Sequence, residues 1–245
     1  MFRLLLLTVL LLPLFSTCAR APAPAPPLTS NPIDRYRFRC VPIDSNYVAE
    51  HLDELEAKFG ANLRAKAYRD KLLAALAFYP ALRNVEIHLR RKVLRTSMAA
   101  RPLRLGGGPG RRRYAIYVDD ITDKPNDFRK SSYSAQVGCF IHELGHIMHY
   151  ERQKNDALVA QGMAYVTNQK FKNSYEKIAD DYGFSVGGGY YLYLFRTFIF
   201  EKADLPPAYL AFKRRNYRSN KEMLKLHLDY VRERGLSYCG RYLGE

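Results

Sequence analysis

The stretch of residues 134–152 reads SAQVGCFIHELGHIMHYER, and it decides the fold that we expect. Placed on a helix at 100° per residue, it has one broad apolar arc. The opposite arc carries small residues together with His142, His146 and His149, so one face is predicted to pack and the other to face a site. Small residues let a neighbouring backbone approach closely. Because His142 and His146 lie one helical turn apart, their imidazoles can bind one Zn²⁺ ion.

The run His142-Glu143-Leu144-Gly145-His146 has the HExxH pattern and resembles the active-site helix of the zincin metallopeptidases. The resemblance implies that Glu143 is the general base. The metzincin branch of this family requires Gly three residues and His six residues after the second ligand. This chain has His149 and Arg152 there, so that branch is excluded.

Further along, Tyr175-Glu176-Lys177-Ile178-Ala179-Asp180 resembles the ExxxD helix of the gluzincins, the thermolysin-like group. The resemblance implies that Glu176 is the third zinc ligand and that Asp180, on the same helix face, accepts the free ring N–H of a ligating histidine. Asp181 and Glu151 remain alternative ligands. The 29 residues between His146 and Glu176 exceed the gap in thermolysin, so an inserted helix over residues 156–170 is expected.

Two other residues share the metal-bearing face of the predicted helix. Cys139 is expected to be a small buried packing residue, since free cysteine is among the most buried residue types. His149 can line the cleft or support the ligands. As a third ligand only three residues after His146 it would strain a tetrahedral site.

The remaining pattern is helix-rich. Helices are predicted over 46–59 and 63–78, the first stopped by Gly60 and the second by Pro80, and strands over 84–90 and 113–118. Later helices are predicted over 174–182 and 190–202, and a last helix begins at the capping box formed by Ser219 and Glu222. The helix over 190–202 is apolar nearly all round but too short for a membrane span.

The predicted fold is therefore α+β: a helix-rich zincin-like domain with a small twisted β-sheet packed on the HExxH helix. In zincins an edge strand beside the metal binds the extended substrate, and 113–118 is our candidate for that strand. For the donor that steadies the oxyanion, Tyr190 and Tyr191 are the possibilities.

The first residues indicate export. Arg3 precedes an apolar run too short to span a bilayer, which is typical of a signal peptide, and residues 1–18 end in a segment that resembles the lipobox of bacterial lipoproteins. That resemblance implies a lipid anchor at Cys18 in the cell envelope, with a secreted soluble form as the alternative. Residues 19–32 are an Ala/Pro-rich tether, and residues 33–245 form a single catalytic domain. Cys40 and Cys239 are the expected disulfide pair.

The 245 residues carry 39 Lys and Arg against 24 Asp and Glu, a net charge of +15. The basic residues lie in short clusters without a nucleic-acid-binding pattern beside them, so we do not expect a nucleic-acid partner. The sequence predicts a zinc-dependent peptidase that uses a metal-activated water on a peptide or protein substrate. The rivals are a non-catalytic envelope lipoprotein with a metallopeptidase-like domain, and a basic adhesion module for anionic lipid or nucleic acid.

Overall fold

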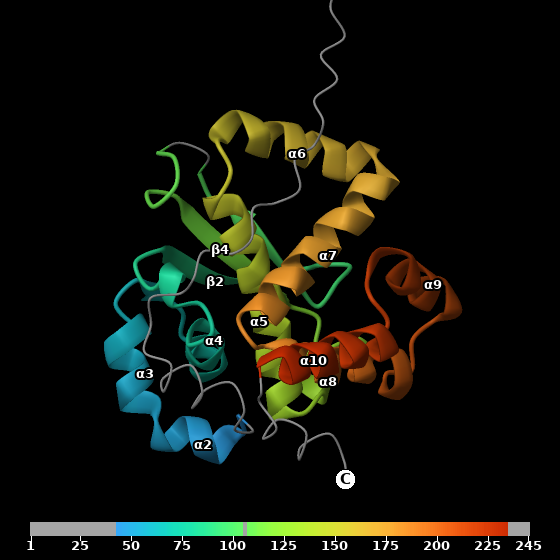
Figure 1. The fold of residues 1–245 in the computed structure, drawn as a ribbon, viewed down its shortest axis with the longest axis horizontal. Helices are drawn as coiled ribbons and strands as arrows, with labels where there is room; N and C mark the ends of the chain where they lie inside the picture. Colours follow the sequence, from blue (N-terminus) through green and yellow to red (C-terminus); the bar gives the residue numbers. More distant parts are fainter. Residues whose placement is uncertain (1–42, 105–106, 235–245) are drawn as a thin grey trace, which may run out of the picture.

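The protein is described here by a computed structural model that covers residues 43–104 and 107–234 (Figure 1). Helices dominate this part of the chain, and one four-stranded mixed sheet accompanies them. The predicted helix-rich α+β fold is confirmed. The proposed signal peptide, Cys18, the tether and both partners of the suggested disulfide, Cys40 and Cys239, lie outside the described residues.

The sheet has the strand order β1-β2-β4-β3. Its strands are β1 (Leu63–Arg64), β2 (Glu86–Lys92), β3 (Met98–Pro102) and β4 (Arg113–Asp119). β1, β2 and β4 are parallel, whereas β3 is antiparallel to β4 and forms an edge of the sheet. The prediction that residues 113–118 form the edge strand is therefore wrong. β4 is an interior strand because β3 pairs with its outer side. Both faces of β4 are largely buried.

The N-terminal helices also differ from the prediction. Residues 46–59 form two helices, α2 (Ser45–Glu50) and α3 (Leu52–Phe59), because the backbone leaves the helical conformation at His51. Residues 63–78 do not form one helix either. Leu63 is buried and pairs with Ile87 in the sheet, and α4 (Arg69–Leu76) begins only after Tyr68, which has a positive φ of 55°.

The long helix α5 (Tyr133–Glu151) is the central element of the fold. It packs against α4, α7, α8 and strand β3, and Figure 1 shows α2 to α4 on one side of it and α8 to α10 on the other. The predicted helix over 134–152 is confirmed. The side chain of Ser132 caps its start by accepting a hydrogen bond from the Ala135 N–H at 3.3 Å.

The second half of the chain is almost entirely helical, as predicted. Its helices are α6 (Asn155–Thr167), α7 (Gln169–Ser185), α8 (Gly189–Thr197), α9 (Pro207–Asn216) and α10 (Asn220–Arg234), and a π-helical turn, Phe198–Lys202, extends α8. The capping box is confirmed, since Ser219 and Glu222 exchange hydrogen bonds of 2.8 and 3.2 Å at the start of α10. α9 was not predicted. Across the described residues we find no helix with the length and apolarity to cross a membrane.

Two glycines let the neighbouring helices approach α5 at backbone contact. A Cβ atom on Gly138 would lie 2.0 Å from the carbonyl oxygen of Tyr191 in α8. A Cβ atom on Gly145 would lie 2.4 Å from the carbonyl oxygen of Ala179 in α7. The close approach expected of this small-residue face is confirmed, and it brings α7 next to the histidine pair.

Candidate metal centre

His142 and His146 project from the same face of α5, as their spacing requires. Both are buried, with exposed fractions of 4% and 5%, and their ring centroids lie 4.8 Å apart. Burying two imidazoles together costs free energy unless each finds a partner. The partner that they share comes from α7.

Glu176 of α7 faces both histidines, with its Oε2 atom 3.3 Å from His142 Nε2 and 3.4 Å from His146 Nε2. One ligand atom from each of the three residues lies within 4.8 Å of the others, so this buried group can hold a metal ion. No second group of this kind occurs within the described part of the chain. The interactions with the two histidines outweigh burial and hold the pKa of Glu176 well below its ordinary value.

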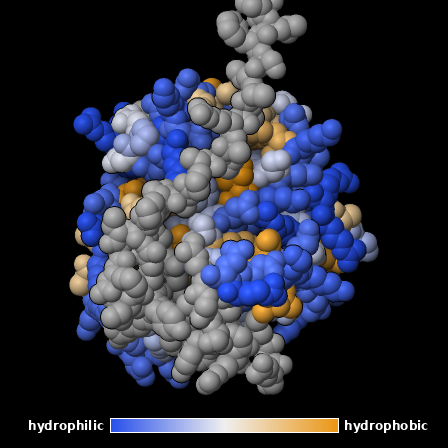
Figure 2. Space-filling model, viewed as in Figure 1, coloured by the Kyte–Doolittle hydropathy of each residue, from blue (hydrophilic) through white to orange (hydrophobic). Residues whose placement is uncertain are grey.

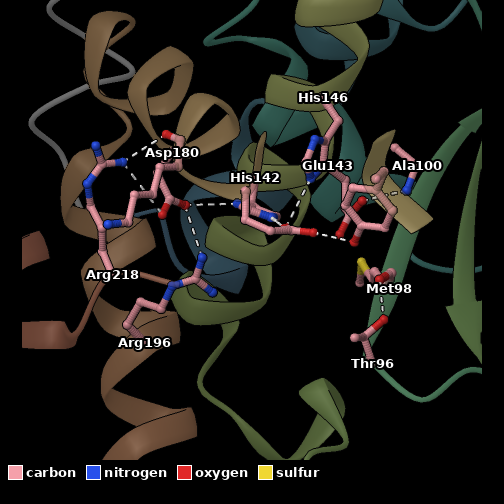
Figure 3. A network of polar contacts seen from close by, with 12 residues as sticks. Thr96, Met98, Ala100, His142, Glu143, His146, Asp180, Arg196 and Arg218 are labelled. Atoms are coloured by element: carbon pink, nitrogen blue, oxygen red, sulfur yellow. Dashed lines mark hydrogen bonds and ion pairs between the residues drawn. The ribbon is translucent and has the colours of Figure 1, made fainter. Parts of the chain in front are cut away.

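Asp180 lies one turn further along α7 and is fully buried. Its Oδ1 atom accepts hydrogen bonds from His142 Nδ1 at 2.8 Å and from Arg196 Nη2 at 3.0 Å, and its Oδ2 lies 3.9 Å from Arg218 Nη1 (Figure 3). Burial opposes its ionisation, but the charge of Arg196 and the contact with His142 lower its pKa. A carboxylate at Nδ1 holds the proton there, so the Nε2 lone pair of His142 faces the metal site.

The same contacts act on the histidine. Burial lowers the pKa of His142, but its hydrogen bonds to Asp180 and Glu176 raise it to about 9. The carboxylates around His142 therefore favour positive charge at this position. A cluster of two buried carboxylates and two imidazoles that attracts positive charge is a donor set that fits a metal cation.

Glu143 is buried and points toward the sheet rather than into the three-residue group. Its Oε2 atom accepts a hydrogen bond of 2.5 Å from the N–H of Ala100 in β3. Figure 3 shows Glu143 on the β3 side of the histidine pair, with Asp180 on the far side. Glu143 is therefore held between the edge strand and the two histidines of the candidate metal centre.

Tyrosines from three parts of the chain surround the group. The Tyr175 ring stacks on His146 at 5.0 Å, the Tyr165 hydroxyl donates to Glu176 Oε1 at 2.6 Å, and the Tyr217 ring lies 5.9 Å from that of His142. Burial and the carboxylate of Glu176 raise the pKa of Tyr217 well above its ordinary value, so its phenol remains protonated. None of these residues was predicted. The chain has 19 tyrosines, and only Tyr175, beside Glu176, has a local signal.

The other candidates of the sequence analysis lie outside the three-residue group. Asp181 pairs with Arg218 at 2.8 Å, and Glu151 accepts a hydrogen bond from the Tyr114 hydroxyl. His149 contacts Gln161 at 3.1 Å, and Cys139 is a buried free cysteine, as expected. The possible oxyanion donors lie on α8, where the Tyr191 ring packs on Phe78 and the Tyr190 ring lies beside His227. Neither of these ring contacts involves a residue of the three-residue group.

The chain was compared with protein-family models, with curated proteins and with solved structures, and no match was found in any of the three comparisons.

Proposed function

We propose that the protein is a zinc-dependent peptidase of the gluzincin type, with His142, His146 and Glu176 as ligands and Glu143 as the general base. One observation carries the proposal. A buried His-His-Glu group lies beside a carboxylate that is outside the ligand set and touches an edge strand. A structural zinc site has no use for such a carboxylate, because all four of its positions are filled by ligands.

The donor set favours zinc. Two imidazole nitrogens and one carboxylate oxygen are the ligands of many catalytic zinc sites, which keep a fourth position open for water. When bound, zinc would acidify that water and polarise the carbonyl of the scissile peptide. A His-His-carboxylate set also suits iron in oxygenases. The HExxH spacing and the base at Glu143 favour hydrolysis.

β3 is the element on which an extended peptide can bind. Both polar backbone groups of Ala100 point away from β4, since its N–H donates to Glu143 and its C=O accepts a hydrogen bond of 3.2 Å from the Tyr150 hydroxyl. A substrate strand paired along β3 would take over these backbone groups. Its scissile bond would then lie next to Glu143, and the Glu143 carboxylate, released from Ala100, is free to accept a proton.

The residues around the group supply the remaining functions. Asp180 orients His142, Tyr165 orients Glu176, and the protonated Tyr217 phenol is the donor that we assign to the developing oxyanion. Glu143 passes the proton that it accepts to the leaving amine.

We propose further that the enzyme acts at the cell envelope, anchored at Cys18. Cys18→Ala should release it from the membrane fraction, and unchanged partitioning would rule out the anchor.

The experiment that tests the proposed function is Glu143→Gln in the full chain. The purified variant should keep about one zinc per chain and lose peptide hydrolysis by a factor on the order of a hundred or more, because glutamine cannot accept the proton. Glu151→Gln changes another acid on α5 that lies outside the group, and it should hydrolyse peptides like the wild type. Zinc-loaded wild type that cleaves no peptide of a broad library would favour the non-catalytic lipoprotein.

A further inference from the structure

We propose that α6 binds the surface of an anionic phospholipid bilayer through its outer face, formed by Val159, Met163 and Val166 and called the α6 face below. The inference goes beyond the proposed peptidase activity and does not depend on it. It follows from the exposure of these apolar side chains, the absence of charge along the helix, and the cations at both of its ends.

The α6 face is apolar where a solvated helix would carry charge. Val159, Met163 and Val166 have exposed fractions of 49%, 68% and 83%, and their spacing puts them on one side of the helix. No charged residue occurs over residues 157–167, although 26% of the chain is charged. An exposed apolar patch of this kind marks a binding surface for a protein or a membrane.

The α6 face also protrudes from the molecule. Figure 1 shows α6 at the margin of the fold, and the helix on which it chiefly packs is α7. In Figure 2 the surface is largely hydrophilic, and hydrophobic atoms appear around α6. A hollow of about 760 Å³ lies beneath the helix, but its walls do not enclose Met163 and Val166, because both side chains keep most of their surface exposed. A protruding apolar face can enter the interfacial layer of a bilayer.

Lysines flank the α6 face at both ends. Lys154 precedes the first residue of α6, and Lys170 and Lys172 follow its last residue. Lys154 and Lys170 are exposed, and neither pairs with an acidic side chain of the described residues. Asp156 is the one acidic residue between Lys154 and Lys172. Each lysine near an anionic membrane surface contributes about 1 kcal/mol to binding, so charge and apolar area act together.

Contacts with Tyr165 of α6 hold two cations next to the α6 face. The guanidinium carbon of Arg101 lies 5.5 Å and the ammonium nitrogen of Lys172 lies 5.1 Å from the centroid of the Tyr165 ring. This charge favours a bilayer over a second copy of the chain as the occupant. Two copies, each with a net charge of +15, would bring like charges together at this face, whereas anionic headgroups neutralise them.

The chain contains no tryptophan, so a single introduced indole reports only its own surroundings. Met163→Trp places the indole on the α6 face. The matched control is Val93→Trp, since Val93 is 64% exposed and directly follows the basic residues 90–92 at the end of β2. Val93 lies at the other end of the sheet from α6, because Arg112 bonds to Asn155 of α6 just before β4 starts, and β2 is parallel to β4.

Both tryptophan variants would be made in the full chain with Cys18→Ala, so that no lipid at Cys18 contributes. They would be titrated with vesicles of phosphatidylcholine and phosphatidylglycerol whose acyl chains carry bromine, a quencher of indole fluorescence. The Met163→Trp emission should shift to the blue and be quenched at least about twofold, because an interfacial helix buries its apolar face at the acyl boundary. The Val93→Trp emission should do neither.

Further changes in the Met163→Trp chain separate the apolar from the charged contribution. Val166→Asp should raise the lipid concentration at half-quenching at least about tenfold, whereas Val93→Asp adds the same charge elsewhere and should leave it unchanged. Lys154→Gln with Lys170→Gln should raise it about tenfold on vesicles with phosphatidylglycerol and hardly at all on pure phosphatidylcholine. Circular dichroism should show that all variants are folded, since each changed side chain is exposed.

The contradicting results are distinct. A Met163→Trp emission that vesicles do not change, or quenching that survives Val166→Asp, would overturn the inference. Equal quenching of the Val93→Trp indole would assign the membrane contact to the basic residues 90–92 instead. A blue shift that grows with protein concentration in the absence of lipid would assign the α6 face to a second copy. The proposed peptidase fails by other measurements, the absence of zinc or of cleavage, and neither of them changes the emission.

Discussion

Gly145→Ala tests whether the backbone contact between α5 and α7 sets the position of Glu176, the proposed third ligand. The added Cβ would stand 2.4 Å from the carbonyl oxygen of Ala179, and carbon atoms do not approach backbone oxygen closer than 3.0 Å. Both partners are helix backbone, so no side chain can rotate away. α7 must retreat by at least about 0.6 Å, and Glu176 lies on the same turn. Zinc–ligand distances tolerate only about ±0.2 Å.

We expect the zinc affinity of Gly145→Ala to fall by about 10- to 100-fold, which corresponds to roughly 1.4–2.7 kcal/mol. The free energy of unfolding of the metal-free protein should fall by less than this. Overpacking costs about 1–3 kcal/mol, but replacing Gly by Ala in a helix returns up to about 1 kcal/mol. Competition with a chromogenic chelator gives the affinity, and urea unfolding in EDTA gives the stability. The control is Gly162→Ala, which meets no neighbour and should bind zinc like the wild type.

The reasoning would be refuted if Gly145→Ala bound zinc as tightly as the wild type, because the α5–α7 contact would then not control Glu176. Equal losses of zinc affinity in the two glycine variants would also contradict it, since only one of them has a backbone neighbour.

Three further predictions concern buried groups. Asp180→Asn removes the partner of the buried Arg196, so the metal-free protein should lose about 3–5 kcal/mol of stability in urea unfolding, and Arg196→Met in the same chain should recover part of it. Tyr217→Phe should retain zinc but lower kcat by about 10²–10³, measured on a peptide that the wild type cleaves. Burial lowers the pKa of His227 to about 4, against about 6.5 unfolded. This residue therefore contributes stability that is complete above pH 6.5 and is lost as the pH falls toward 4. Between pH 7 and 4.5, the free energy of unfolding of the wild type in EDTA should fall by about 2–3 kcal/mol more than that of His227→Leu.

Each of these three predictions has a contradicting result. Additive losses in the Asp180→Asn and Arg196→Met double variant would mean that the two side chains do not depend on each other. A Tyr217→Phe enzyme with an unchanged kcat would remove the phenol from the mechanism. Parallel acid profiles for the wild type and His227→Leu would show that the imidazole is solvated in the folded protein.

Local spacing explains which parts of the site could be predicted from the sequence. His142 and His146 are four residues apart, as are Glu176 and Asp180, so each pair shares a helix face whatever the rest of the fold does. The structure brings these four residues together. Arg196 is outside any such pattern, because its contact with Asp180 depends on how α8 packs against α7 rather than on sequence spacing.

The errors in the fold have a similar cause. Residues 98–102 have no alternating apolar pattern and little β propensity, yet they form β3 because β4 offers them an unpaired edge. Residues 63–78 have a helical pattern, but the sheet takes Leu63 because its side chain is buried beside β2. In both cases tertiary pairing overrides the local preference.

The position of Asp180 has a consequence for the order of events during synthesis. All three proposed metal ligands precede residue 177, whereas the cations that balance Asp180 are contributed by Arg196 and Arg218. Arg218 emerges from the ribosome about 40 residues after Glu176, a delay of a few seconds at ~5–20 residues per second. Until then the growing chain contains every ligand, but the carboxylate behind His142 lacks its counter-charges. The charge environment of Asp180 is therefore complete only once the chain extends past residue 218.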